Sequence, residues 1–279
     1  MDAVIKILKE TAQISILVAI MMILVDALNV LSKNKLQNFF INAKKFKQYV
    51  LSSFIGAMPG CIGAFTNVSL YIHGLISFGA LAGSMIAVSG NEAFVMLAMF
   101  PKEALILFFI LFIIGIFSGM LIDSFVKKFN ISVCKNCKEM RVHIDENNFK
   151  HYFMEHIWEH IIKNHLWKTA LWTLGALAIV EFGLKYLRLE QFTSEYKIAF
   201  LFLGALVGLI PESGPHLIFA TLFAQSLIPF SVLLTSSIVQ DGHGMLPLLS
   251  YSFKDSLKIK AFNFIIGLTV GLIFYASGF

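Results

Sequence analysis

The feature that most constrains this chain is its succession of long apolar segments. Between Glu103 and Asp123, nineteen residues follow one another without a charged side chain. An apolar helix of about 20 residues matches the hydrocarbon core of a bilayer. Of the 279 residues, 57% are hydrophobic and 14% are charged, and the mean hydropathy is +0.77. A soluble protein of this size cannot bury that much apolar surface. The composition excludes a soluble enzyme and a disordered chain, and it predicts an all-α, polytopic membrane protein.

The second half of the sequence repeats the first. When the sequence is shifted by 152 residues, Gly56–Lys102 aligns without gaps on Gly208–Lys254, and 12 of the 47 positions are identical. Chance would produce roughly three or four identities at ordinary residue frequencies. Two apolar segments resemble each other in any case, so the informative matches are the shared proline and glycine residues. We therefore predict an internal repeat.

Each repeat is expected to hold five apolar segments, which makes about ten transmembrane helices. An odd number makes the second repeat enter from the opposite face, the inverted topology of many secondary transporters. Sixteen basic residues, among them Lys254, Lys258 and Lys260, fall on one side of the predicted topology and six on the other. Because basic loops face the cytoplasm, we expect a multi-pass protein of the inner (cytoplasmic) membrane with both termini outside. The predicted units are a five-helix repeat (1–123), a cytoplasmic loop (124–166) and a second five-helix repeat (167–279).

Carboxylates inside apolar sequence are the first candidates for a functional site. They are Asp26, Glu92, Glu181, Glu212 and Asp241. Each is costly in hydrocarbon unless it is paired, hydrated or bound to a metal. Glu92, Glu212 and Asp241 lie beside glycine or proline residues that break apolar helices at corresponding points of both halves, which is typical of a site at the membrane midplane. Asp26 and Glu181 lie near the ends of their segments, where an interfacial position is the competing interpretation.

The residues around these breaks indicate the chemistry of the site. SGNEAF and QDGHGM lie at corresponding breaks, with Gly90 aligned on Gly242 and Ser89 on Asp241, and MPGCIGAFTN aligns with IPESGPHLIF. The predicted metal ligands are Asn91, Glu92, Glu212, His216, Asp241 and His243; Asp26, Asn67, Glu181, Ser213 and Gln240 are additional candidates for transport or proton coupling. Oxygen and imidazole donors suit a borderline-hard divalent cation, Mn²⁺ first, with Zn²⁺ and Fe²⁺ as competitors. A metalloid such as arsenite requires several thiolates, and the membrane portion has only Cys61.

The loop 124–166 carries a second constellation of residues. Cys134 and Cys137 form a CxxC, and a tetrahedral zinc site could be completed by a histidine; the candidates for this cytoplasmic site are Cys134, Cys137, His143, His156 and His160. The competing interpretation is a basic loop with incidental histidines. HIWEH also matches the HxxEH pattern of zinc peptidases, but no third ligand is placed and the segment leads into a membrane span. A membrane metallopeptidase and a metal sensor are therefore the alternatives from other functional classes.

Four segments together carry a family resemblance: GAMPGCIGAF, SGNEAFVMLAMFP, LVGLIPESGPHLIF and SIVQDGHGMLPLL. They resemble the family named "putative ten-transmembrane heavy-metal exporters", whose members are labelled arsenic efflux proteins or manganese transporters. The resemblance covers nearly the whole chain and implies ten helices in two halves and export of a metal. The matching positions are Pro59, Asn91, Glu92, Pro211, Glu212, Ser213, Gly214, Pro215, His216, Gln240, Asp241, Gly242 and His243.

The expected function is secondary-active export of a divalent metal by alternating access, with manganese the preferred ion and an arsenical permease the alternative. No GxxxxGK[ST] nucleotide-binding motif occurs, so a proton, ion or metal gradient would drive transport. Protonation of a ligand could release the metal, since bound ligands must be deprotonated. We expect no enzymatic activity and no prosthetic group. The expected partners are the lipid bilayer and the transported ion, without nucleic acid, and a homo-oligomer is left open.

Overall fold

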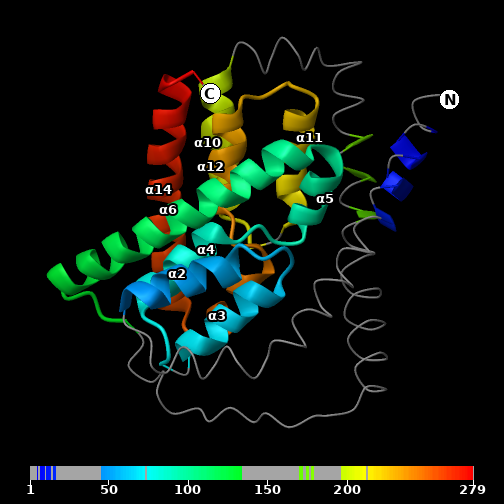
Figure 1. Ribbon diagram of the computed structural model, residues 1–279. Helices are drawn as coiled ribbons and strands as arrows, with labels where there is room; N and C mark the ends of the chain where they lie inside the picture. Colours follow the sequence, from blue (N-terminus) through cyan, green and yellow to red (C-terminus); the bar gives the residue numbers. More distant parts are fainter. Residues whose placement is uncertain are drawn as a thin grey trace, which may run out of the picture.

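The computed structural model describes residues 45–72, 74–133, 196–211 and 213–278, with scattered residues between 5 and 16 and between 170 and 178. Every regular element in these ranges is a helix (Figure 1). The first half contains α2 (Lys45–Gly56), α3 (Ile62–Ile72), α4 (Phe78–Ala87), α5 (Glu92–Met99) and α6 (Pro101–Lys128). The second contains α10 (Lys197–Gly208), η2 (Gly214–His216), α11 (Leu217–Ala224), α12 (Phe230–Val239), η3 (Gly242–Gly244), α13 (Met245–Tyr251) and α14 (Phe253–Ala276).

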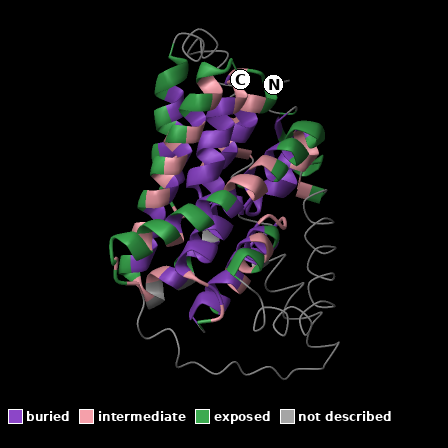
Figure 2. Ribbon diagram, turned by 60° about the vertical axis from the view of Figure 1, so that its left-hand side comes forward, coloured by how far each residue is buried: buried purple, intermediate pink, exposed green. Residues whose placement is uncertain are grey.

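Three stretches of these ranges are long and apolar enough to cross a bilayer: α6, α14 and the interrupted pair α4–α5 over Phe78–Met99. At 1.5 Å per residue, the other helices, of 12 residues or fewer, are too short to cross alone. Buried residues line the inner sides of the bundle and exposed residues its outer sides (Figure 2). The exposed sides of α6 and α14 carry large apolar side chains, including Phe109, Leu121, Phe253 and Ile265, as a lipid-facing surface requires.

The two halves share one pattern of helices and breaks. α2 and α10 begin and end at residues that differ by 152, and so do α4 and α12. The halves also interlock, because α5 contacts α11 and α13 contacts α3, and Figure 1 shows α5 beside α11. The structural correspondence therefore follows the same offset as the sequence repeat. The inverted orientation of the two repeats stays a prediction.

Two apolar segments, 64–88 and 216–239, are each divided into two helices. After α3, Gly74 adopts φ +71° and donates to the Tyr71 carbonyl, while Leu75 donates to the Leu70 carbonyl. This pair of bonds is a Schellman motif, which ends a helix. Ser226 (φ +58°) forms the equivalent motif after α11. These caps end the helices although the surrounding sequence is apolar.

Glycine allows α4 to pack directly on α6. A Cβ on Gly83 would lie under 3.0 Å from the carbonyl oxygen of Gly115, and a Cβ on Gly115 would lie equally close to the Gly83 carbonyl. With Gly79 and Gly119, these residues form facing GxxxG motifs, which let membrane helices approach closely. α6 continues to Lys128, past the predicted end of the first repeat at 123. The close packing holds α4 rigidly in the interior, where all ten of its residues are buried.

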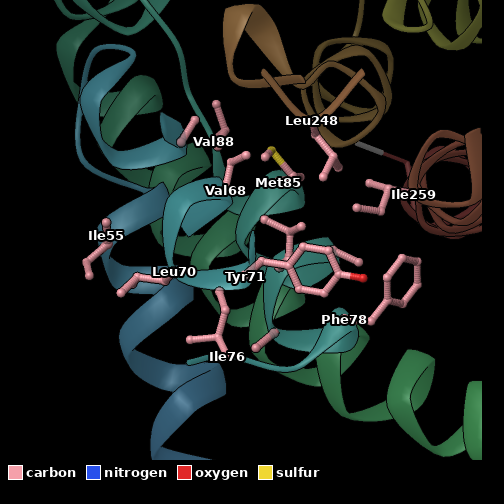
Figure 3. Close-up of a cluster of buried hydrophobic side chains, with 14 of the residues drawn as sticks. Ile55, Val68, Leu70, Tyr71, Ile76, Phe78, Met85, Val88, Leu248 and Ile259 are labelled. Carbon is pink, nitrogen blue, oxygen red and sulfur yellow. The ribbon is translucent and has the colours of Figure 1, made fainter. Parts of the chain in front are cut away.

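A cluster of apolar side chains joins the first half to α13 and α14 (Figure 3). Leu248 and Ile259 of the second half contribute to the same cluster as Val68 and Met85. At its edge, Tyr71 Oη donates a hydrogen bond to Asp255 Oδ2 at 2.8 Å. Both side chains are buried. A polar bond therefore ties α3 to the start of α14 across the two halves.

Candidate functional site

The helix breaks of both halves meet at one place in the interior. Gly60, in the break between α2 and α3, donates its backbone N–H to the Gly90 carbonyl at 3.0 Å. Gly90 and Gly242, in the breaks after α4 and α12, have φ of +56° and +52°. A Cβ on Gly242 would lie 3.9 Å from the Gly90 Cα. Glycine is the residue that adopts this left-handed conformation without strain. The breaks after α4 and α12 therefore occur next to each other in the interior.

Equivalent residues of the two repeats touch at this point. Gln240 Nε2 donates to the Val88 carbonyl at 3.1 Å, and residues 240 and 88 are separated by the repeat offset of 152. Val88 and Gln240 are the extended C-caps of α4 and α12. For the predicted inverted repeats, this contact would place the pseudo-symmetry axis at the meeting point of the breaks.

Two buried oxygen atoms lie beside the glycines. Cβ atoms on Gly90 and Gly242 would lie 2.9 Å and 3.0 Å from Ser213 Oγ, and 3.9 Å and 3.7 Å from Gln240 Oε1. Neither oxygen has a hydrogen-bond partner among the described residues. A buried polar atom without a partner costs free energy, and such atoms in a native structure call for an explanation such as an ion or a water molecule.

Glu92 and His216 bring a carboxylate and an imidazole into the same region of the fold. Glu92 begins α5 and His216 ends η2, and both side chains are buried. Within the described ranges, no donor reaches Glu92 Oε2. His216 Nδ1 lies 3.0 Å from Ser236 Oγ, while Nε2 makes no hydrogen bond of good geometry, although the Ile210 carbonyl interacts with the ring. The Nδ1 contact with Ser236 helps to fix the orientation of the ring, as an outer-shell partner does for a metal-ligating histidine.

Asp241 has partners inside the protein. Asn263 Nδ2 donates to Asp241 Oδ1 at 2.7 Å, and the Lys260 ammonium forms an ion pair with Oδ2. Lys260 Nζ also donates to the Gly208 carbonyl at 3.0 Å. The carboxylate is fully buried, and its charge is neutralised by a lysine of α14.

Lys260 and Asn263 are the site residues that sequence reasoning missed. Lys260 was counted with the basic residues on one side of the predicted topology and was not considered as a site residue. The structure begins α14 at Phe253, where Ser252 Oγ accepts the Asp255 N–H, so Lys260 lies two turns inside the helix and is 9% exposed. A lysine seven residues inside an apolar helix was the available signal.

The other predicted residues divide into those the structure describes and those it does not. Asn91 is buried just before α5. Asn67 lies on α3 and donates to the Ser52 carbonyl of α2 at 2.9 Å, a tie within the first half. For His243 only the backbone, in η3, is described. The remaining candidates lie outside the described residues: Asp26, Glu181 and Glu212 in the membrane portion, and Cys134, Cys137, His143, His156 and His160 in the loop.

The described side chains alone do not complete a metal centre. In the ranges that the structure covers, no group of three or more His, Cys, Asp or Glu side chains could hold one metal ion. Glu212 and the His243 side chain, which neighbour Ser213 and Gly242 in the chain, are outside that search. The described donors near the breaks are carboxylate, hydroxyl, amide and imidazole groups, which suit a hard or borderline cation.

Comparison with known proteins identifies one family. The model of the family described as "Putative, 10TM heavy-metal exporter" matches residues 1–180 and again residues 169–277. The two matches cover nearly the whole chain. No curated protein and no solved structure matches the chain.

Proposed function

This chain belongs to the family of ten-transmembrane heavy-metal exporters, a family of multi-pass membrane proteins, and we propose that its own cargo is a divalent metal cation. Manganese is the preferred ion, with zinc and iron as competitors. The observation that carries the proposal is the pair of buried oxygen atoms beside Gly90 and Gly242 that lack partners in the described ranges, Ser213 Oγ and Gln240 Oε1. Glu92 Oε2, at the start of α5, and His216 Nε2, at the end of η2, are likewise buried without a hydrogen bond. A cation would satisfy these atoms, which are costly to bury otherwise.

The donor types support a divalent metal. Oxygen and imidazole ligands together match Mn²⁺, Fe²⁺ and Zn²⁺ better than an alkali ion. Asn91, Glu212, Asp241 and His243 would complete the ligand set, because they flank the breaks that meet in the interior. Asp26 and Glu181 are the next candidates for coupling transport to a proton. The metal is cargo in this scheme, so no resident cofactor is needed.

We propose transport by alternating access between two inverted repeats. The short helices and breaks at corresponding positions support this proposal, since discontinuous helices around a central site recur in such carriers. The distribution of basic residues favours insertion in the inner membrane with both termini outside. The bilayer would contact the apolar faces of α6 and α14, and the loop 124–166 would sense or buffer metal in the cytoplasm.

Metalloid efflux is the second candidate, and it depends on Cys61. This buried cysteine directly precedes α3 in the first break, so it is the thiol nearest in sequence to the site. A metalloid requires more than one soft ligand, which makes a single thiol a weak centre. Loss of arsenite efflux in Cys61→Ser, with manganese transport unchanged, would favour this alternative.

The deciding experiment measures uptake of Mn²⁺, Zn²⁺, Fe²⁺ and Mg²⁺ into proteoliposomes, with and without a proton gradient. We expect saturable Mn²⁺ uptake by the wild type and none by Glu92→Gln. Glu103→Gln is the matched control, because Glu103 is exposed at the start of α6 and lies in the same repeat. Wild-type uptake of no divalent cation, or equal uptake by Glu92→Gln, would refute the proposal.

A further inference from the structure

The buried ammonium of Lys260 is the feature that the proposed function does not use. Lys260 is the one buried lysine among the described residues. Its Nζ contacts two oxygen atoms, the carboxylate Oδ2 of Asp241 and the carbonyl of Gly208. Gly208 is the last residue of α10, so its carbonyl belongs to the negative end of that helix. A carboxylate and a helix C-terminal carbonyl are also the groups that bind transported cations in broken-helix carriers.

The ion pair belongs to only one of the two repeats. At the repeat offset of 152, Asp241, Lys260 and Asn263 correspond to Ser89, Phe108 and Leu111. The first repeat forms the same arrangement of α4, α5 and α6 without a charged pair. The backbone fold therefore does not require the pair. A buried ion pair is also a poor way to gain stability, because desolvation offsets much of its Coulomb energy.

Asp241 lies where the breaks of the two repeats meet, which places the ion pair beside the proposed transport site. It lies between Gln240 and Gly242, which form the contacts between the breaks. The lysine chain is flexible and its ammonium is a compact point charge, so it can leave one carboxylate oxygen without disturbing the helix. We propose that the Lys260 ammonium is a tethered cation that neutralises Asp241 when the carrier is empty, and that the transported divalent metal displaces it. This inference rests on the proposed function.

The Lys260 ammonium and the transported metal ion therefore compete for the Asp241 carboxylate. The tethered ammonium keeps the empty site neutral at Asp241, and each metal ion must replace it to bind there. Removal of the ammonium leaves Asn263 as the partner of buried Asp241 among the described residues, and the carboxylate charge is then uncompensated by Lys260. A divalent cation then binds without an internal competitor. Metal affinity should rise, whereas the stability of the metal-free protein should fall.

The test follows thermal unfolding of the purified full-length protein against Mn²⁺ concentration, with Mg²⁺ as a second probe. We expect Lys260→Gln to unfold at a lower temperature without metal, and to be restabilised by Mn²⁺ with a midpoint at least about tenfold below that of the wild type. The double variant Asp241→Asn/Lys260→Gln should show no such gain. Lys258→Gln is the matched control, because Lys258 pairs with Asp255 outside the breaks.

A second variant keeps the test decisive if Lys260→Gln fails to fold. Lys260→Arg should hold the carboxylate more tightly through a forked, bidentate contact, and should raise the Mn²⁺ midpoint at least about tenfold. An unchanged midpoint in a folded Lys260→Gln or Lys260→Arg protein would overturn the proposal.

Transport measurements separate this inference from the proposed function. If the wild type transports Mn²⁺ and Lys260→Gln has an unchanged midpoint, the tethered cation is refuted and the exporter stands. If Lys260→Gln gains Mn²⁺ affinity but the wild type transports no divalent cation, the exporter is refuted and the tethered cation stands. If neither protein responds to Mn²⁺ or Mg²⁺ in any assay, both are refuted.

Discussion

Replacement of Tyr71 by phenylalanine should weaken the contact between the two halves at the place where α3 meets α14. The mutation removes only the hydroxyl that donates to Asp255 Oδ2 at 2.8 Å. The ring keeps its edge contact with Phe78, and Asp255 keeps Lys258 at 3.0 Å. A hydrogen bond to a charged group contributes about 1.5–3 kcal/mol. Since about 1.4 kcal/mol changes an equilibrium constant tenfold, the equilibrium constant for separating α3 from α14 should rise about 10- to 150-fold.

Hydrogen exchange measures that shift directly. The amides of α3 should lose protection by about 10- to 150-fold in Tyr71→Phe, because α3 separates from α14 when this end opens. Tyr49→Phe is the control for a bond within one half, since Tyr49 Oη donates to Asp123 Oδ2 on α6. It should leave α3 protection unchanged. Equal protection of α3 in wild type and Tyr71→Phe would refute the idea that this bond holds the halves together.

The opposite end of the repeat lacks the corresponding bond. At the repeat offset, Tyr71 and Asp255 correspond to Phe223 and Glu103. The Phe223 ring packs on Phe100 at 5.1 Å, and Glu103 is exposed. One end is therefore joined by a hydrogen bond between halves and the other by an aromatic contact. This difference makes the Tyr71 variant a test of one end alone.

Three further predictions concern the helix packing, the break and the loop. Gly83→Leu should separate α4 from α6, because its Cβ would meet the Gly115 carbonyl; overpacking of this kind costs about 1–3 kcal/mol or more, and unchanged thermal stability would contradict it. Gly90→Ala should abolish transport, because a Cβ there lies 2.9 Å from Ser213 Oγ and the left-handed backbone adds strain of about 1–2 kcal/mol. Gly278→Ala, at φ +88° in open space, is the control for strain alone, so equal transport by both variants would refute the role of this contact. Cys134→Ser/Cys137→Ser should keep most transport activity in proteoliposomes, and complete loss with normal expression would place the loop in the transport path.

The sequence by itself determined the class of protein and the location of the breaks that surround the candidate site. Apolar segments without charges can be solvated only by lipid, and only helices satisfy their backbone there. Gly90 and Gly242 follow α4 and α12 with a left-handed backbone, a conformation that glycine adopts more readily than any other residue. The 152-residue repeat then showed that the breaks occur in pairs. These inferences depend on local chemistry, so one sequence was enough for them.

The pairing of charges was decided only by the tertiary structure. Asp241 and Lys260 are separated by 19 residues and lie on different elements, so helical periodicity relates neither to the other. Their contact depends on how α14 packs against α12, and on the cap at Ser252 that starts α14 early enough to bury Lys260. The same holds for Gln240 and Val88, which meet because the breaks of the two halves pack against each other. Long-range packing sets these distances, and residue spacing alone carries no information about them.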